Sequence, residues 1–303
     1  MPPSPIPACY LPVYEREHIK RMTKWRISVF LILAVTGAFA QTATPQSSSP
    51  VYQVTVVSRT VKAINYGTRS EPTKIDFKGT VLMVDARGDA TVQSRKGAVE
   101  VKAKFEHVGP PTAFGPSYLT YVLWAISPDG HAQNLGELIL DASNKGKLDV
   151  TTHFQAFALI VTAEPYFSVT QPSDVVVMEN ELRPDTMGSV EQVDAKYELL
   201  PRKPFVYDIK SQNVTTSGEK LSKDDYEATL ALYEAQNAIQ LAKAAGAEQY
   251  APDVFQKAQQ LYQQALDART RKAGAKAVIT SAREAAQRGS DARTVSLQKQ
   301  SGQ

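Results

Sequence analysis

The spacing of apolar residues changes near residue 220, from a period of two to a period of about 3.5. In the first part, residues 99–105 alternate apolar and charged side chains, which predicts a strand with one buried face. Residues 118–126 are largely apolar on both faces and predict a central strand. Further strands are predicted at 51–63, 79–85, 89–95, 135–140, 147–153, 155–163 and 174–179.

Turn-forming residues separate these segments at 86–89, 127–130 and 144–146. Asn, Asp and Gly tolerate the left-handed backbone that tight turns need. Many short strands with regular turns predict an antiparallel β-sandwich over residues 51–180, and we favour an immunoglobulin-like one. Residues 181–221 are rich in Pro, Lys, Asp and Ser and are interpreted as a linker, which can include one more strand at 193–199.

Three stripes of small and apolar residues follow, each with spacings of three and four. Ser222 is the expected N-cap of the first helix, and Pro252 fits the first turn of the second. Small residues let antiparallel helices pack closely, so we predict an Ala-rich helical hairpin extended by a third helix over 222–297, with a disordered tail at 298–303. The α+β fold class follows from the two parts. The stripes are Ala228, Leu232, Ala235, Ile239, Ala242 and Gly246; Val254, Ala258, Leu261, Ala265 and Ala268; and Ala275, Val278, Ala282, Ala285, Gly289 and Ala292.

The first forty residues have the order of a secretory signal peptide. Basic residues at 20–26 precede an apolar run at 27–35, and the small residues Ala38 and Ala40 precede Gln41, which predicts cleavage before Gln41. A retained membrane anchor is the alternative, but residues 27–40 are too few to cross about 30 Å of hydrocarbon. Met22 would begin a signal peptide of ordinary length, so we interpret residues 1–21 as the result of a start site assigned too far upstream. The polar residues 41–50 are predicted to be a disordered spacer.

Charge and cysteine content argue against some classes of protein. Without residues 1–40 the basic and acidic residues are equal in number, so nothing attracts the chain generally to nucleic acid. The only cysteine, Cys9, lies upstream of the predicted cleavage site, which fits an oxidising compartment and excludes a disulfide framework.

No motif indicates catalysis, a metal or a cofactor. His107, His131 and His153 have no ligand or catalytic partner at a recognisable spacing, although they could still meet in the fold. Residues 115–118 lack the second glycine of a nucleophile elbow, because Leu119 stands in its place. We therefore expect a protein that is not an enzyme, with no cofactor and no metal.

Two groups of side chains in the helical part could form an interaction surface. Aromatic side chains could cover the hairpin or stack on a ligand, and basic side chains could attract anionic lipid head groups or wall polymers. The interpretation we favour is that the aromatic side chains pack within the protein and that the basic ones form a solvated helix surface. The candidate residues are Tyr226, Tyr233, Tyr250, Arg269, Arg271, Lys272 and Lys276.

Residues 235–258, with the turn Gly246-Ala247-x-x-Tyr250-Ala251-Pro252 between two Ala-rich helices, resemble a bacterial envelope family of unknown function. That family occurs in exported lipoproteins and ahead of OmpA-like peptidoglycan-binding domains. The resemblance covers about 224–295, and residues 118–180 are similar to the β domain that precedes such helices in some members. The OmpA-like module is absent from the 303 residues, so direct peptidoglycan binding is not carried over, and the family supplies no catalytic residues.

Together these observations predict an exported, non-catalytic bacterial envelope protein, periplasmic or associated with the outer membrane, that acts as a scaffold or interaction module. Its expected partners are other envelope proteins. Peptidoglycan or anionic lipid is a further candidate that no binding motif supports, and nucleic acid is not expected. The alternative is a periplasmic protein that binds a small ligand, lipid or glycan.

Overall fold

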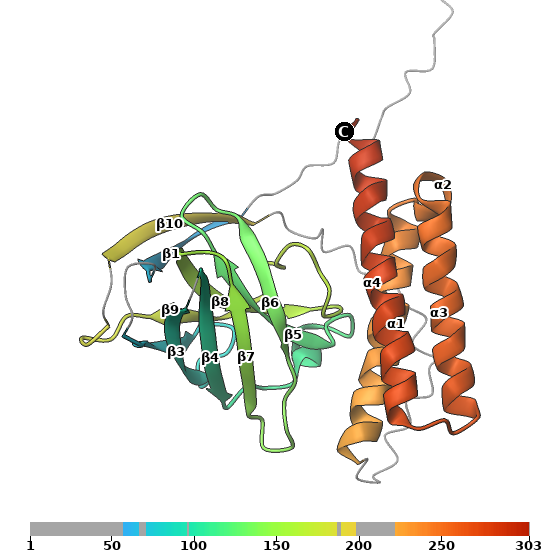
Figure 1. Cartoon of the computed structure of the whole chain (residues 1–303), viewed down its shortest axis with the longest axis horizontal. Coiled ribbons are helices and arrows are strands. Elements are labelled where there is room, and N and C mark those ends of the chain that lie inside the picture. The colour runs from blue at the N-terminus through green and yellow to red at the C-terminus, as the bar shows by residue number, and fades with distance from the viewer. Residues whose placement is uncertain (1–56, 67–70, 96, 187–188, 198–221, 303) are drawn as a thin grey trace, which may run out of the picture. The chain divides into compact units, whose positions relative to one another are not determined.

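A computed structural model describes residues 57–66, 71–95, 97–186, 189–197 and 222–302. These residues form an α+β structure, with a large antiparallel sheet followed by a helical region (Figure 1). The predicted signal peptide, its cleavage site at Ala38, Ala40 and Gln41, and the spacer at 41–50 lie outside the described residues. The strands are β1 (Val57–Asn65), β2 (Thr73–Gly79), β3 (Arg87–Arg95), β4 (Ala98–Glu106), β5 (Thr120–Ile126), β6 (Ala132–Leu138), β7 (Gly146–Thr152), β8 (Ala156–Glu164), β9 (Val176–Glu181) and β10 (Ser189–Tyr197). The helices are α1 (Lys223–Ala244), α2 (Ala247–Tyr250), α3 (Pro252–Thr270) and α4 (Ala275–Gln300), with a 3-10 turn at Pro111–Phe114.

The sheet is nearly a barrel. Its hydrogen-bonded neighbours follow the order β6–β5–β8–β9–β2–β3–β4–β7. The ends of this path approach each other, because β6 contacts β7 and Leu140 forms an isolated bridge with Gly146. Strand β1 pairs with the first residues of β8 and carries β10 beside it. One continuous sheet therefore stands where we expected two stacked sheets, and the immunoglobulin-like sandwich is not confirmed.

Alternating side chains fill the interior of this barrel. Val99, Val101, Ala103 and Phe105 are buried, as their spacing predicted. Strand β5 is buried on both faces and lies between β6 and β8, which confirms that 118–126 contains a central strand. Its Tyr121, Leu123 and Ala125 belong to the barrel core, whereas the side chains between them belong to a second core that also contains helix residues.

The prediction of a strand at 79–85 and a turn at 86–89 was wrong. Residues 80–86 form the loop between β2 and β3, and residues 87–89 already belong to β3. The apolar residues of this loop suggested a buried strand, but Val81 is 91% exposed. The strand that pairs with β3 is instead β2, whose Ile75 and Phe77 enter the barrel core.

Three long helices pack side by side, and α4 contacts both α1 and α3 (Figure 1). Ser222 caps α1 by accepting a hydrogen bond from the Asp225 amide at 3.2 Å, and Pro252 opens α3, as predicted. Most of the predicted stripe residues are buried between the helices. Gly289 marks a close approach of α4 to α1, because a Cβ there would lie 2.9 Å from the carbonyl carbon of Ala238.

The turn of the Gly246–Pro252 motif has a packing explanation. Gly246 has φ +76°, a left-handed conformation that ends α1 and favours glycine. Ala247 and Ala251 are buried with Phe255 in a small separate core. The residues of this motif therefore shape the connection between α1 and α3.

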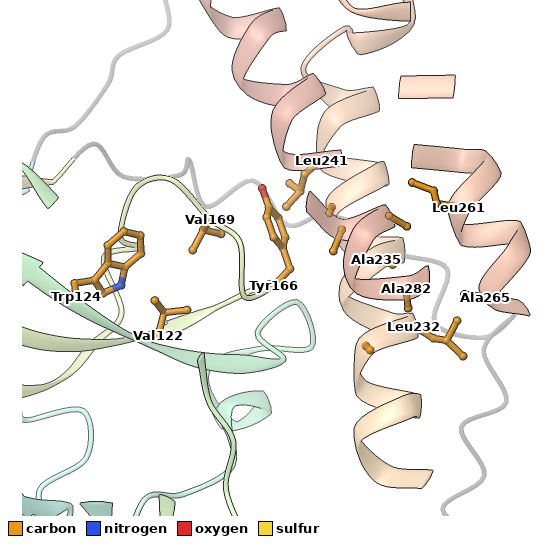
Figure 2. Close-up of a cluster of buried hydrophobic side chains, with 14 of the residues drawn as sticks. Val122, Trp124, Tyr166, Val169, Leu232, Ala235, Leu241, Leu261, Ala265 and Ala282 are labelled. Carbon is orange, nitrogen blue, oxygen red and sulfur yellow. The ribbon is translucent and has the colours of Figure 1, made fainter. Parts of the chain in front are cut away.

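A shared core joins the sheet to the helices. Val122, Trp124, Ile126 and Ile160 point out of the barrel into a cluster that contains Leu232, Ala235 and Leu241 of α1. Tyr166 and Val169, from the connection between β8 and β9, belong to the same cluster (Figure 2). All described residues belong to one compact unit. The predicted boundaries at 180, 221 and 297 stay predictions; β10 falls within 181–221, and α4 extends to Gln300.

Candidate functional site

Most of the basic side chains singled out in the sequence lie at one end of the helices. Here the start of α1 meets the connection between α3 and α4, and they form an open groove of about 290 Å³. Arg269 and Lys272 line this groove, Arg271 lies between them in sequence, and Lys276 is in the first turn of α4. We call this feature the helix-end groove. It is lined by Asp225, Ala228, Thr229, Ala268, Arg269, Lys272, Gly274, Ala275 and Val278.

The helix-end groove carries both signs of charge. Arg269, Arg271, Lys272 and Lys276 are exposed, while Asp225 approaches from the first turn of α1, where a carboxylate complements the helix dipole. The Ser222 hydroxyl lies 2.6 Å from a carboxylate oxygen of Asp225. Basic residues outnumber acidic ones at the groove, which suits weak attraction of an acidic partner. Near a charged membrane, the attraction of each basic residue contributes at most about 1 kcal/mol.

The three predicted tyrosines do not come together. Tyr226 follows Asp225 and is 45% exposed; burial raises its pKa, and the negative charge of Glu137 adds to this. Tyr233 interacts with Tyr262 of α3 instead. Tyr250 lies in α2, beyond the other end of α1, and its carbonyl accepts a hydrogen bond from Lys299 Nζ at 2.6 Å. Tyr226 follows the groove-lining Asp225 in sequence but does not itself line the helix-end groove.

A buried acidic cluster joins the sheet to the helices, and the sequence did not reveal it. Glu234 of α1 is fully buried, and Glu137 of β6 has a side chain only 3% exposed. Arg283 of α4 donates a hydrogen bond to Glu137 Oε2 at 2.6 Å, and the Thr120 hydroxyl donates to Glu137 Oε1 at 2.8 Å. The Arg283 guanidinium also lies 3.8 Å from the centre of the Phe167 ring.

Burial raises the pKa of Glu234 well above its ordinary value, and the nearby Glu137 raises it further. We therefore assign the proton of this pair to Glu234 and the negative charge to Glu137, beside Arg283. The arrangement is a neutral acid next to an ion pair. The ion pair between Arg283 and Glu137 links α4 to β6 of the sheet.

Two further polar side chains fasten the helices to the sheet. Asn237 Nδ2 of α1 donates to the carbonyl oxygens of Ser117 at 3.2 Å and Pro165 at 3.0 Å. Ser290 Oγ of α4 donates to the carbonyl oxygen of Ser168 at 2.7 Å. Glu234 and Asn237 stand three residues apart, next to the small-residue stripe of α1. Polar residues beside a buried stripe were the one sequence signal that could have located this contact.

A second buried acid lies within the sheet. Trp124 Nε1 donates to Thr162 Oγ1 at 2.8 Å, and the Thr162 hydroxyl donates to Glu164 Oε1. The Ser173 amide donates to the same oxygen at 2.7 Å. Burial raises the pKa of Glu164 to about 8, so this carboxyl is largely protonated at neutral pH.

The histidines do not add a metal centre to the described part of the chain. His131 is exposed and contacts Asp129 through Nδ1 at 2.6 Å. Within the described ranges, no group of three or more His, Cys, Asp or Glu residues is placed to hold a metal ion. In the same residues, no helix is both long enough and apolar enough to cross a membrane.

Comparison of the chain with known protein families finds no match, and comparison with curated proteins finds none either.

Proposed function

We propose that this chain is an exported, non-catalytic bacterial envelope protein that acts as a scaffold or interaction module in the periplasm or at the outer membrane. The order of basic, apolar and small residues in 1–40 supports export. We propose further that the helical part and the β part belong to the envelope family that the turn Gly246–Pro252 resembles, and that other envelope proteins are the partners.

The helix-end groove is the observation that carries the interaction role. It collects Arg269 and Lys272 with the neighbouring Arg271 and Lys276 at one exposed end, and Tyr226 follows its Asp225 in sequence. Arg and Tyr are enriched among residues that dominate protein interfaces, and exposed cations steer acidic partners. The polar fastening of α1 and α4 to the sheet supports the scaffold role, because it holds this end in a constant relation to the barrel.

Site-specific crosslinking in the native cell tests this proposal. A photoreactive residue replacing Lys276 should crosslink to an envelope protein, whereas the same residue at Gln260, on the exposed side of α3, should not. Mass spectrometry of the fractionated protein should find an N-terminus at Gln41. An intact N-terminus upstream of Met22 in the cytosol would refute export, and an uncrosslinked monomer with the residue at 276 would refute the scaffold role.

The second candidate is binding of a small ligand, lipid or glycan, and the shape of the helix-end groove favours it. Its volume of about 290 Å³ is close to the lower end of the range of ligand pockets, roughly 300–1,000 Å³. Apolar walls from Ala228, Ala268 and Val278 stand beside charged residues at its rim. A thermal-shift screen with wall fragments and lipids should then raise the melting temperature, and no shift with any of them would remove this candidate.

A closer fold relationship is also a proposal. The antiparallel pairing of the strands supports a relationship between the β part and immunoglobulin-like sandwiches. The short connections at Gly246–Ala251 and residues 271–274 support an antiparallel hairpin extended by a third helix. An experimental structure that separates the sheet into two stacked layers would support the first relationship.

A further inference from the structure

The loop between β2 and β3, residues 80–86, exposes three aliphatic side chains together. Val81 is 91% exposed, Val84 62% and Leu82 43%. Single exposed apolar residues are ordinary, but a group of them in one loop marks a contact surface. Met83, between them, is partly buried and packs on the barrel core, so it anchors the loop while its neighbours face solvent. We call residues 80–86 the aliphatic loop.

Hydrogen bonds within the protein hold the backbone of the aliphatic loop. The Met83 amide donates to Thr80 O at 3.0 Å, and the Ala86 amide donates to Met83 O at 3.1 Å. Arg87 Nη1 donates to the carbonyl oxygens of Val84 at 2.5 Å and Ala86 at 2.7 Å. The loop therefore presents its aliphatic side chains in a fixed conformation, with several of its backbone polar groups already satisfied.

On the side of residues 108–118, the surroundings of the aliphatic loop are poor in charge. Met83 Cε lies 3.9 Å from the position of a Cβ at Gly109, so the stretch 108–118 is adjacent. That stretch contains no Asp, Glu, Lys, Arg or His, and the loop itself contains only Asp85. Lys78 and Arg87, both exposed, stand where the loop joins its strands. Val81, Leu82 and Val84 therefore form an apolar tip, with the exposed Asp85 beside it and Lys78 and Arg87 at its base.

We propose that the aliphatic loop inserts into a lipid surface, with Val81, Leu82 and Val84 among the acyl chains. Three side chains are too small an area for a stable protein interface, which buries about 800 Å² on each partner. The apolar tip of Val81, Leu82 and Val84 matches hydrocarbon, where backbone groups must find their hydrogen bonds within the protein. Lys78 and Arg87 stand at the base of the loop, where long cationic side chains can reach head groups. Lys78 also pairs with Glu181 at 3.8 Å.

This site goes beyond the proposed function and depends neither on export nor on the helix-end groove. The two surfaces differ in physical signature. Attraction of basic residues to anionic lipid weakens as salt screens it, whereas insertion of aliphatic side chains into neutral lipid does not. Purified protein and vesicles therefore test the loop by itself.

The experiment uses the full chain with Cys9→Ser and an environment-sensitive fluorophore on Val81→Cys or, as a control, on Leu297→Cys of α4. Phosphatidylcholine vesicles should shift the emission of the probe at 81 to shorter wavelength, and quenchers on the acyl chains should quench it. Raising the salt from about 0.05 M to about 0.5 M should leave both effects unchanged. The probe at 297 should not respond. Because the reporter is local, lipid binding by the apolar residues 27–35 would not imitate this result.

A matched pair of charge substitutions completes the test. Leu82 and Leu297 are both 43% exposed. Leu82→Asp should weaken the vesicle response at 81 at least about tenfold, and Leu297→Asp should leave it unchanged, since charge is costly only where the side chain enters lipid. Circular dichroism of both variants verifies the fold. The proposal would be overturned if the probe at 81 did not respond to vesicles, or if high salt abolished its response. It would also be overturned if the response followed protein concentration without vesicles, and that result would identify a second copy of the chain as the occupant.

Discussion

Gly289 lets α1 and α4 approach at Ala238, and its missing Cβ is what the packing requires. A methyl group at 289 would lie 3.0 Å from the Ala238 Cβ and closer still to the backbone, which cannot move as a side-chain end can. Close contacts of this kind are typical of helices that pack through small residues.

Gly289→Ala should therefore lower the free energy of unfolding. Overpacking costs about 1–3 kcal/mol, which exceeds the gain of about 1 kcal/mol from the better helix propensity of alanine. The control Gln287→Ala, exposed on the same helix, should change stability by less than about 0.5 kcal/mol. Denaturant titration of both variants measures the difference, and a Gly289→Ala protein as stable as the parent would contradict the close approach.

Glu164 makes stability depend on pH in a predictable direction. Its pKa rises from 4.5 to about 8 on folding, so the folded state binds the proton more tightly than the unfolded state. Its contribution to stability is therefore complete below about pH 4.5, decreases as pH rises, and is lost above about pH 8. The raised pKa of Glu234 acts in the same direction.

Glu164→Gln should flatten this profile, because an amide does not titrate. The parent should lose up to about 1.4 kcal/mol per pH unit through this group within the window, and the variant should be the more stable of the two near pH 8. Glu106→Gln is the control: Glu106 is exposed beside Lys145, and its pKa is lowered, so its effect belongs to acid pH. Equal slopes for the parent and Glu164→Gln between pH 5 and 8 would refute the assignment.

At the scale of elements, Arg283 connects α4 to β6. Glu137 is buried and depends on Arg283 for its counter-charge, with Glu234 alongside. Breaking a buried ion pair from one side leaves an uncompensated charge, but Arg283 is itself 35% exposed and water can replace part of the interaction.

Arg283→Ala should cost about 2 kcal/mol at neutral pH, after allowance for this exposure. Arg288→Ala on the same helix removes an exposed pair with Asp291 and should cost less than about 0.5 kcal/mol. Adding Glu137→Gln to Arg283→Ala should recover part of the loss, because it removes the unpaired charge. Thermal unfolding of the four variants, with Glu137→Gln alone included, checks the coupling, and additive effects would argue against it.

Sequence patterns predicted most of the elements in which buried positions repeat with the period of a strand or of a helix. The alternation at 99–105, the doubly apolar run ending at Ile126 and the three helical stripes all correspond to elements of the structure. The aliphatic loop was mistaken for a strand because an apolar run carries no information about its own exposure. Closure of the sheet into a near-barrel depends on pairings distant in sequence, such as β4 with β7 and β2 with β9, which local pattern does not encode.

The candidate site was predictable only in part, for a similar reason. The basic run between α3 and α4 is local, so its residues stay together in the fold. The tyrosines were grouped by helical spacing, but the partners of each side chain come from other elements. The acidic cluster joins β5, β6, α1 and α4, and no single segment contains enough of it to be recognised.

At the scale of the whole molecule, the sheet and the helices share one core. Trp124 reports on that core from the sheet side, and Leu241 and Ala235 belong to it from the helix side (Figure 2). Two parts that bury each other's apolar side chains should lose structure together.

Unfolding should therefore be a single transition. In a Trp25→Phe chain, fluorescence from Trp124 and the far-ultraviolet signal of the helices should have the same denaturant midpoint. Asn237→Ala, which removes two hydrogen bonds across the shared core, should shift both midpoints equally. Loss of the helical signal at a lower denaturant concentration than the Trp124 signal would show that the helices are an autonomous part.

The junction between β6 and β7 gives the barrel a preferred place to open. At this junction the described residues provide the isolated bridge between Gly146 and Leu140, which follows β6, and the hydrogen bond from Thr152 to Gln133, in place of a full ladder. A closed sheet should separate first at the junction that has the fewest hydrogen bonds. Pulled or heated, the sheet should part along this line first, so amide protons on the facing edges should exchange with solvent while those of β5 and β8, beneath the helices, stay protected.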